Sequence, residues 1–310
     1  MSWAASGAAP AAPVPAHTRI AAALAGMGPV LGVDAGGTGT RAALVIDGAP
    51  QRSLTAGPFN FLLHDDGVAQ MAALVRAACP AAAGLGIPGI ARQRGAAGAF
   101  AAAVSEACGG LPVRVGSDAV AAWLGAFLGE PGIVVIAGTG SGAVGGSAGA
   151  LVRVGAHGYL IGDEGGGYWI GRRAVRAALA AAEGAGPPTV LGDALTEATG
   201  AALDQLVVRV HRAPADRTIL AGLAPLVGRC AEGPDPDPVA AAIVSDAAHA
   251  LAGHALALRR RLGDLPVAGV GGVFGLASLR AEFGRATGAV PAAVPPQVGA
   301  ALLAASPDDP

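Results

Sequence analysis

Two glycine-rich turns, each placed between apolar runs, carry residues that could bind an anion. The first lies in VLGVDAGGTGTRAALVIDG, residues 30–48, where the two runs predict buried strands. A hairpin needs only two loop residues. The additional glycines fit two interpretations: an ordinary flexible hairpin, or backbone N–H groups brought toward a phosphate by positive φ or close approach. The residues of this turn are Gly36, Gly37, Thr38, Gly39 and Thr40.

The second turn repeats the pattern of the first. The segment GIVVIAGTGSGAVGGSAGALVRVG, residues 132–155, reads as strand, Gly-Thr-Gly turn, strand, turn and strand. This self-similarity predicts the duplication of one β-hairpin domain, with a boundary near residues 129–132. Two such turns favour phosphate binding more than one would. The residues of the second turn are Gly138, Thr139, Gly140 and Ser141.

Acidic residues stand where strands and glycine turns lead into helices. Asp118 follows a predicted strand and opens a helix, which points it into the crevice where α/β sheets bind ligands. Helix capping by Asp118 or by Ser117 is the commoner role, and the spacing alone favours it. Asp163 and Glu164 lie in a glycine-bracketed turn before another helix. Capping is again the simplest explanation, although no basic residue follows until Arg172.

The composition limits the chemistry that the chain can perform. Its 310 residues are enough for two domains, and its net charge of −2 gives no electrostatic case for nucleic acid or an anionic membrane. All twenty basic residues are arginine. The absence of lysine excludes a Walker phosphate loop and a Schiff-base enzyme. Any nucleotide phosphate must therefore be held by backbone amides, hydroxyls, a metal ion or arginine.

The remaining features predict a cytoplasmic protein without a membrane segment. The three cysteines are far apart and show neither metal spacing nor a disulfide framework. No uninterrupted apolar run reaches the ~20 residues of a membrane helix. Residues 1–28 are rich in alanine and proline and lack the features of a signal or transit peptide, so we expect a disordered extension. Met27 is an alternative start.

The order of predicted elements indicates an α/β fold in two halves. Three strands, then alternating helices and strands, predict a mixed sheet covered by helices over residues 29–129. The second half, residues 130–305, begins with the repeated hairpin. A mainly helical region follows, with helices expected over residues 168–182, 191–206, 218–231 and 238–262. The strand 267–270 precedes GGVFG, and residues 306–310 form a tail.

Several of these motifs together resemble a known family. GDEGGGYWIGRRAV is similar to the signature of the N-acetylglucosamine kinase and BadF/BadG/BcrA/BcrD-type ATPase family, and GSDAVAAWLGA, IAGTGSGA and PQVGAALLA match in order and spacing. With GVGGVF, they resemble the phosphate and adenosine motifs of the sugar kinase, heat-shock ATPase and actin superfamily. The resemblance covers residues 30–305. It implies two ribonuclease-H-like, actin-like ATPase domains with an ATP and sugar cleft between them.

The resemblance leaves two functions to weigh. One branch consists of amino-sugar kinases, and the other of regulatory ATPases that activate a partner enzyme and carry cluster-binding cysteines at a dimer interface. The chain lacks paired cysteines suited to such a cluster, and it also lacks the zinc motif of the bacterial repressor–kinase family. We therefore expect an ATP-dependent kinase that phosphorylates the 6-hydroxyl of N-acetylglucosamine, with glucosamine and N-acetylmuramate as alternatives. The sequence leaves both a monomer and a homodimer open.

The resemblance also assigns roles on the sugar side. It implies that Asp118 is the general base, that Asp163 binds sugar hydroxyls with Glu164 behind it, and that Asn60 contacts the sugar. Gly167 belongs to the sugar-side turn, which is unusually rich in glycine at residues 165–167.

On the nucleotide side, the resemblance implies that Asp34, at the end of the first strand, binds Mg²⁺ through water, as such an ion prefers. A strand-end aspartate satisfied by the turn's N–H groups is a compatible alternative. Gly271 and Gly272 would allow the close approach of adenosine. Thr139 and Gly140 could face both ligands. Ala156 departs from the family pattern, because related kinases tend to have glycine there.

Overall fold

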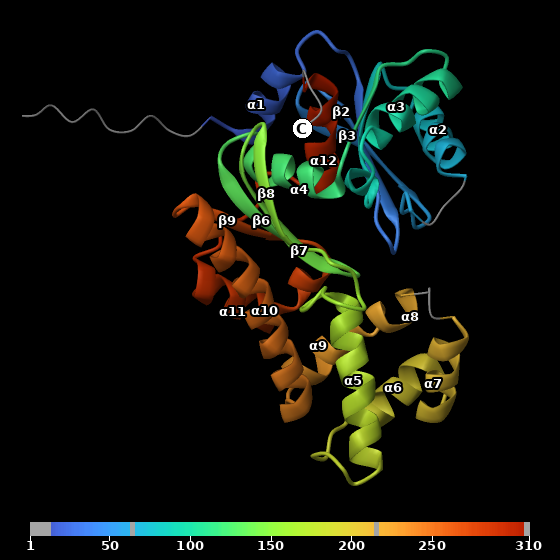
Figure 1. The fold of residues 1–310 in the computed structure, drawn as a ribbon, viewed down its shortest axis with the longest axis vertical. Helices are drawn as coiled ribbons and strands as arrows, with labels where there is room; N and C mark the ends of the chain where they lie inside the picture. Colours follow the sequence, from blue (N-terminus) through green and yellow to red (C-terminus); the bar gives the residue numbers. More distant parts are fainter. Residues whose placement is uncertain (1–13, 63–65, 214–216, 307–310) are drawn as a thin grey trace, which may run out of the picture.

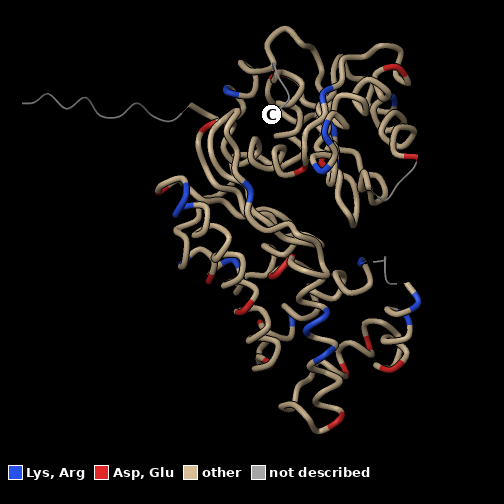
Figure 2. The backbone as a smooth tube through the Cα atoms, in the orientation of Figure 1, with Lys and Arg blue, Asp and Glu red and all other residues tan. Residues whose placement is uncertain are grey.

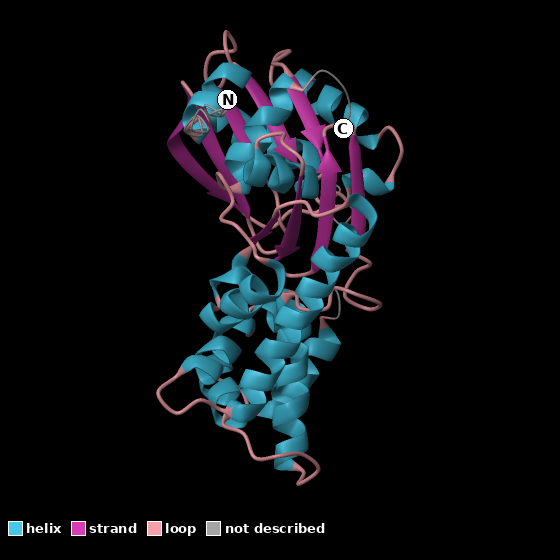
Figure 3. Ribbon diagram, turned by 90° about the vertical axis from the view of Figure 1, so that its left-hand side faces the viewer, coloured by secondary structure: helices cyan, strands magenta, loops and turns pink. Residues whose placement is uncertain are grey.

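The computed structural model describes residues 14–62, 66–213 and 217–306. The molecule is elongated, with both sheets toward one end and a purely helical region at the other (Figure 1, Figure 3). Charged residues are spread over the whole length rather than gathered in one patch (Figure 2), in keeping with the small net charge.

The first sheet contains the opening glycine turn. Its strands are β1 (Val30–Asp34), β2 (Thr40–Ile46), β3 (Ala49–Ala56), β4 (Ala82–Gly86) and β5 (Val113–Gly116), in the order β3-β2-β1-β4-β5. The chain from β1 to β3 is antiparallel, whereas β4 pairs with β1 and β5 with β4 in parallel. This is the ribonuclease-H-like arrangement that the resemblance implies. It places the carboxyl ends of β1, β4 and β5 at one edge of the sheet.

Helices cover both faces of this sheet. On one face, α2 (Gly67–Ala78) and α3 (Ala96–Ala107) bury a core with the apolar side chains of β1 and β4. On the other face, α12 (Pro296–Ala301) and the short helix η3 (Leu302–Ala305) pack on β1 and β4. The fit of α12 depends on two glycines, since a Cβ on Gly32 would contact the Gln297 carbonyl and one on Gly84 the Ala300 carbonyl.

The ends of the chain differ from the sequence prediction. Residues 14–28 are not a disordered extension, because α1 (Ala16–Ala23) buries Ile20 against Val30, Val45 and Val298. The closing segment, expected in the second half, belongs to the first sheet (Figure 1), because α12 supplies part of its core. The predicted extension at residues 1–13 and tail at 307–310 lie outside the described residues. We keep the division at residues 129/130 as a proposal, with the closing segment reassigned.

The second sheet repeats the first in a shorter form. Strands β6 (Gly132–Ala137), β7 (Ser141–Ser147), β8 (Ala150–Gly155) and β9 (Val267–Val270) follow the order β8-β7-β6-β9, with β9 parallel to β6. This equals the order of β3, β2, β1 and β4, as the predicted duplication requires. Helix α4 (Asp118–Phe127) leaves the first sheet and packs Trp123 and Phe127 on the second. The helix therefore joins the two halves at the position where Asp118 lies.

The helical end is built mainly from the region between β8 and β9. It contains α5 (Gly167–Ala182), α6 (Leu191–Thr199), α7 (Leu203–Arg212), α8 (Thr218–Ala221), α9 (Ala224–Glu232) and α10 (Pro238–Leu262), while η2 (Gly272–Gly275) and α11 (Ala277–Thr287) follow β9. The helix expected over residues 191–206 is two helices, because Gly200 adopts a left-handed conformation after α6. The helix expected over 218–231 is also two, α8 and α9, and Pro225 lies in the first turn of α9, where proline is tolerated.

Helix α10 matches the predicted helix 238–262. Among the described residues, it is the one helix long and apolar enough to cross a membrane. Its apolar side chains, including Ile243, Val244 and Leu251, are buried in the core of the second half. We therefore interpret α10 as a core helix. It is capped at its start by Asp237, which accepts a hydrogen bond from the Ala240 N–H at 2.7 Å.

Candidate active site

Asp118 does not cap α4, although its position at the start of the helix favours that role. The Ser117 hydroxyl caps α4 by accepting a hydrogen bond from the Val120 N–H at 3.2 Å, and Asp118 is the first residue inside the helix. Burial raises the pKa of Asp118, whereas the Ala119 N–H and the charge of Arg153 oppose this shift. A carboxylate with a raised pKa is suited to accept a proton.

Asp34 lies near Asp118, at the carboxyl end of β1. Burial, followed by the negative charge of Asp118, raises the pKa of Asp34 to about 7, with Arg41 opposing. Two close carboxylates with raised pKa values form a site that a cation would stabilise. Among the described residues, no three His, Cys, Asp or Glu side chains are grouped so as to hold a metal ion. The two carboxylates suit Mg²⁺, because this ion takes one or two carboxylates together with water and phosphate oxygens.

Asp163 lies beside the second glycine turn, in the loop between β8 and α5. It is buried and has a left-handed φ of 62°, which is rare for a residue with a side chain. Its carboxylate accepts hydrogen bonds from the backbone N–H groups of Gly158, at 3.2 Å, and Ser141. Burial raises the pKa of Asp163, against these hydrogen bonds and the charge of Arg217. The backbone hydrogen bonds therefore fix the Asp163 carboxylate, although the backbone of this residue is in an unfavourable conformation.

Gly140 is needed for this arrangement. A Cβ on Gly140 would contact Oδ2 of Asp163, so any larger residue would displace the carboxylate. Gly166 is also in close contact, because its own Cβ would lie 2.7 Å from the Gly140 carbonyl carbon. Gly167 begins α5 and donates its N–H to the Gly138 carbonyl at 2.8 Å. The glycines at residues 165–167 thus let α5 start directly against the second turn.

Several groups predicted to bind phosphate are already hydrogen-bonded within the protein. The Thr40 hydroxyl donates to the Gly57 carbonyl at 2.9 Å, and the Ser141 hydroxyl donates to the Glu164 carbonyl at 2.6 Å. The Ser141 N–H is bonded to Asp163, and the Gly138 N–H donates to the Gly140 carbonyl at 3.0 Å. The amides of Gly138 and Ser141, which the sequence assigns to phosphate, therefore have partners within the protein, and their role toward phosphate stays a prediction.

The groups that remain free surround one open position beside Gly37. The N–H groups of Gly36, Gly37 and Thr38 donate no hydrogen bond to the described residues. The Thr139 hydroxyl is buried and has no hydrogen-bond partner there either. A Cβ on Gly37 would meet nothing closer than 3.7 Å, with Oγ1 of Thr139 at that distance. Unpaired buried polar groups are costly, which makes this position suited to a ligand that accepts hydrogen bonds.

The glycines of the two turns leave room for close neighbours and do not adopt a backbone conformation that other residues avoid. Positive φ, one of the two expected roles, is not found at Gly36, Gly37, Gly39, Gly138 or Gly140. Gly39 lies in the first turn, where its N–H donates to the Gly36 carbonyl at 3.3 Å. Of the two glycines after β9, Gly271 has a positive φ of 108° and packs on Ala137. A Cβ on Gly272 would meet open space among the described residues.

Asn60 lies in the loop after β3, close to the turn that follows β4. Its Oδ1 accepts a hydrogen bond from the Leu62 N–H at 3.0 Å and would lie 3.1 Å from a Cβ on Gly89. The neighbouring short helix η1 (Ile90–Arg92) connects the two halves, because Arg92 donates to the Ala156 carbonyl at 2.8 Å. Asn60 is therefore placed on the first half, near a contact that reaches the segment leading to Asp163.

Sequence reasoning missed two residues near this site. Nη2 of Arg217 would lie 3.7 Å from a Cβ on Gly37. His254 on α10 lies behind Gly155, and burial lowers the pKa of its ring. Neither residue belongs to a motif, and each reaches the site from a helical segment far along the chain. The absence of lysine was the one available signal, since it left arginine as the cationic side chain for phosphate.

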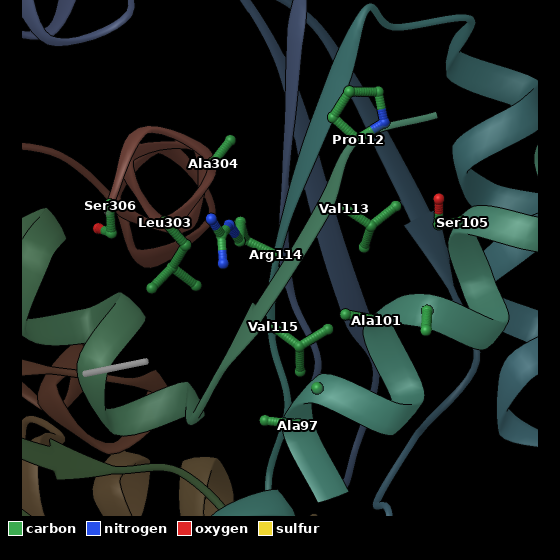
Figure 4. Close-up of a pocket in the computed structure, with 12 residues that line it drawn as sticks. Ala97, Ala101, Ser105, Pro112, Val113, Arg114, Val115, Leu303, Ala304 and Ser306 are labelled. Carbon is green, nitrogen blue, oxygen red and sulfur yellow. The ribbon is translucent and has the colours of Figure 1, made fainter. Parts of the chain in front are cut away.

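The described structure also has a groove that is separate from these residues. It measures about 610 Å³ and lies between α3 and η3, beside the edge strand β5. Arg114 extends from β5 toward Leu303 and Ser306 (Figure 4). None of the predicted site residues lines this groove.

Comparisons with known proteins find similar sequences among amino-sugar kinases. A segment of 117 residues is 36% identical to an N-acetylmuramic acid/N-acetylglucosamine kinase of Clostridium acetobutylicum, covering 37% of the chain and 38% of that kinase. A glucosamine kinase of Vibrio cholerae is 36% identical over 95 residues, covering 31% of the chain and 32% of that kinase. The matches therefore span about a third of these curated relatives.

Structural similarity extends over the whole fold. A crystal structure of a Chromobacterium violaceum protein, named as a candidate N-acetylglucosamine kinase, is 30% identical with a TM-score of 0.73. The similarity covers 90% of the chain and 99% of that protein. The model of the BadF/BadG/BcrA/BcrD ATPase family matches residues 31–304. The chain belongs to the BadF/BadG/BcrA/BcrD ATPase family, with the actin-like ATPase fold that its motifs imply.

Proposed function

We propose that the protein is an ATP-dependent amino-sugar kinase that transfers the γ-phosphoryl group to the 6-hydroxyl of N-acetylglucosamine. Glucosamine and N-acetylmuramate are the alternative acceptors, in keeping with the names of the two curated relatives. The observation that carries the proposal is the pair of interacting carboxylates, Asp34 and Asp118, at the end of β1 that leads into the first glycine turn. This arrangement joins a proton acceptor, a cation site and phosphate-binding amides.

In this proposal, Asp118 acts on the acceptor. It takes the proton of the 6-hydroxyl as the hydroxyl oxygen bonds to the γ-phosphorus, and the bond from that phosphorus to the bridging oxygen breaks to release ADP. Burial keeps the pKa of Asp118 raised, which favours proton uptake. Asp163 and Asn60 would orient the sugar, because hydrogen bonds to a fixed carboxylate are directional.

Asp34 would hold Mg²⁺, with Asp118 close enough to influence the same ion. When bound, such an ion neutralises charge on the β- and γ-phosphates. The amides of Gly36, Gly37 and Thr38, which donate no hydrogen bond to the described residues, would hold the phosphate oxygens together with the Thr139 hydroxyl. Gly271 and Gly272 would face the adenosine, where the open position beside Gly272 leaves room.

A regulatory ATPase is the alternative in a different class. Activators of this kind carry cluster-binding cysteines, whereas the cysteines here, Cys79, Cys108 and Cys230, end α2 and α3 or lie within α9 as free thiols. Free thiols and ATP use support a cytoplasmic location. We favour the kinase on these grounds.

A coupled assay of ADP release over a panel of sugars tests the proposal. We expect release to require MgATP and an amino sugar, with little release in the no-sugar control. ADP release that is equally fast without sugar would overturn the kinase assignment and favour the regulatory ATPase.

A further inference from the structure

We propose that Arg217 binds the γ-phosphoryl group of ATP from the helical side of the cleft. The proposal deepens the proposed function and rests on it. Arg217 precedes α8, and its carbonyl accepts the Ala221 N–H at 3.0 Å, so its backbone is anchored in the helical region. Its side chain reaches the first glycine turn, which belongs to the other half of the molecule.

Three independent features meet at one point. The position of a Cβ on Gly37 lies 3.7 Å from Nη2 of Arg217 and 3.7 Å from Oγ1 of Thr139. The Thr139 hydroxyl is buried without a described hydrogen-bond partner. The amides of Gly36, Gly37 and Thr38 are also free. A guanidinium, an unpaired hydroxyl and free amides around one open position match the oxygens of a phosphoryl group.

Arg217 also lies toward the sugar side. Its charge lowers the pKa of Asp163, after the larger effects of burial and backbone hydrogen bonds. Its guanidinium is 5.8 Å from the ring centroid of Tyr159, which in turn packs on Tyr168 at 4.9 Å. The aromatic pair supports the guanidinium between the sugar-side carboxylate and the phosphate-side turn. A group transferred from the phosphate-side turn to the sugar side would therefore lie within reach of Arg217.

Other arginines near the site have different partners. Arg92 donates to the Ala156 carbonyl, while Arg41 and Arg153 act on Asp34 and Asp118. The chain has no lysine to take the part of a phosphate-binding ammonium. A guanidinium can bind two phosphate oxygens at once and stabilise charge as it develops during transfer. Arg217 is the described cation best placed to do this.

The test compares ADP with a non-hydrolysable ATP analogue, because only the latter has a γ-phosphate. In calorimetric titrations with Mg²⁺, Arg217→Ala should weaken analogue binding at least tenfold and change ADP binding less than threefold. Turnover should fall by roughly 10²–10³, the usual effect of removing one charge-stabilising donor. Arg217→Lys should recover part of both losses. Arg212→Ala, an exposed arginine on α7, is the matched control and should behave as the parent.

Equal loss of ADP and analogue binding, or no loss of either, would overturn the proposal. If Arg217→Ala lowers the melting temperature, Arg217→Gln, which keeps length and polarity, gives the same comparison. The nucleotide titrations need no sugar. They therefore test the role of Arg217 even if the parent protein releases ADP equally fast with and without sugar. That result would overturn the proposed function instead.

Discussion

The two glycine turns occupy equivalent places in the two sheets, yet the structure uses them differently. The turn after β1 is open: the described atoms nearest to a Cβ on Gly37 would be 3.7 Å away, and the adjacent amides donate no hydrogen bond to the described residues. The turn after β6 is filled, because Gly140 packs on Asp163 and the Ser141 hydroxyl and N–H are both hydrogen-bonded. The two similar hairpins therefore carry one turn that is open and one that holds a carboxylate.

This difference teaches that a sequence repeat need not keep one chemical role. The carboxylates follow the same division. Asp34 and Asp118 interact with each other beside the open turn, whereas Asp163 is held by backbone N–H groups beside the filled turn. We expect the open turn to serve the nucleotide and the filled turn to serve the sugar.

The largest expected effect is that of Asp118→Asn. Loss of the proton acceptor should lower turnover by roughly 10²–10⁴, while binding of MgATP and sugar stays within about tenfold because Ser117, not Asp118, caps α4. Steady-state kinetics together with calorimetry would measure the two effects. Near-normal turnover would remove Asp118 from the mechanism.

A pair of alanine substitutions tests the division between the turns. Gly140→Ala should displace Asp163 and weaken sugar binding by about tenfold or more, equivalent to about 1.4 kcal/mol. Gly37→Ala adds a methyl group that the fold accommodates, so sugar binding should stay unchanged while binding of MgATP weakens. Calorimetric titration of each variant with each ligand gives a two-by-two comparison. Equal effects of both variants on both ligands would show that the turns are not specialised.

The pH dependence of stability gives a smaller effect that tests the open side. The folded pKa of Asp34 is raised from 3.8 to about 7. The folded state therefore binds an extra proton between these values, and this contribution to stability is lost as pH rises through about 7. In metal-free buffer, Asp34→Asn should gain in melting temperature relative to the parent between pH 5 and pH 8. A difference that stays constant over this range would contradict the raised pKa.

The smallest expected effect concerns Ala156, beside the filled turn. Its φ of 57° is unfavourable for alanine and would suit the glycine that the family resemblance leads us to expect there. Ala156→Gly should stabilise the protein by roughly 1 kcal/mol, as measured by denaturant unfolding. A loss of stability would mean that the contact of its methyl group with Gly142 outweighs the strain.

The sequence predicts the parts of this account that depend on local pattern. The repeated hairpins, helix α10 and the position of Asp118 at a strand end all follow from periodicity and spacing. The general-base role assigned to Asp118 came only from the family resemblance. The packing of α12 on β1 was not predictable, because it depends on glycines more than two hundred residues away.

The remaining differences have the same origin. Gly37 and Gly140 both belong to glycine-rich turns, and the sequence does not distinguish them. Only the fold shows that Gly37 faces open space and that Gly140 faces Asp163. Arg217 carries no motif and reaches Gly37 only after the two halves are assembled. Sequence reasoning therefore missed Arg217 because its contact with Gly37 joins segments that are far apart in the chain.

The most direct test of the central claim is to identify the product by ³¹P NMR after incubating the protein with MgATP and N-acetylglucosamine. The account predicts equal amounts of ADP and a sugar monophosphate, with the phosphorus signal split by the two protons of carbon 6. Asp118→Asn should form this product far more slowly. Release of inorganic phosphate without any sugar phosphate, at the same rate in the presence and absence of sugar, would contradict the account.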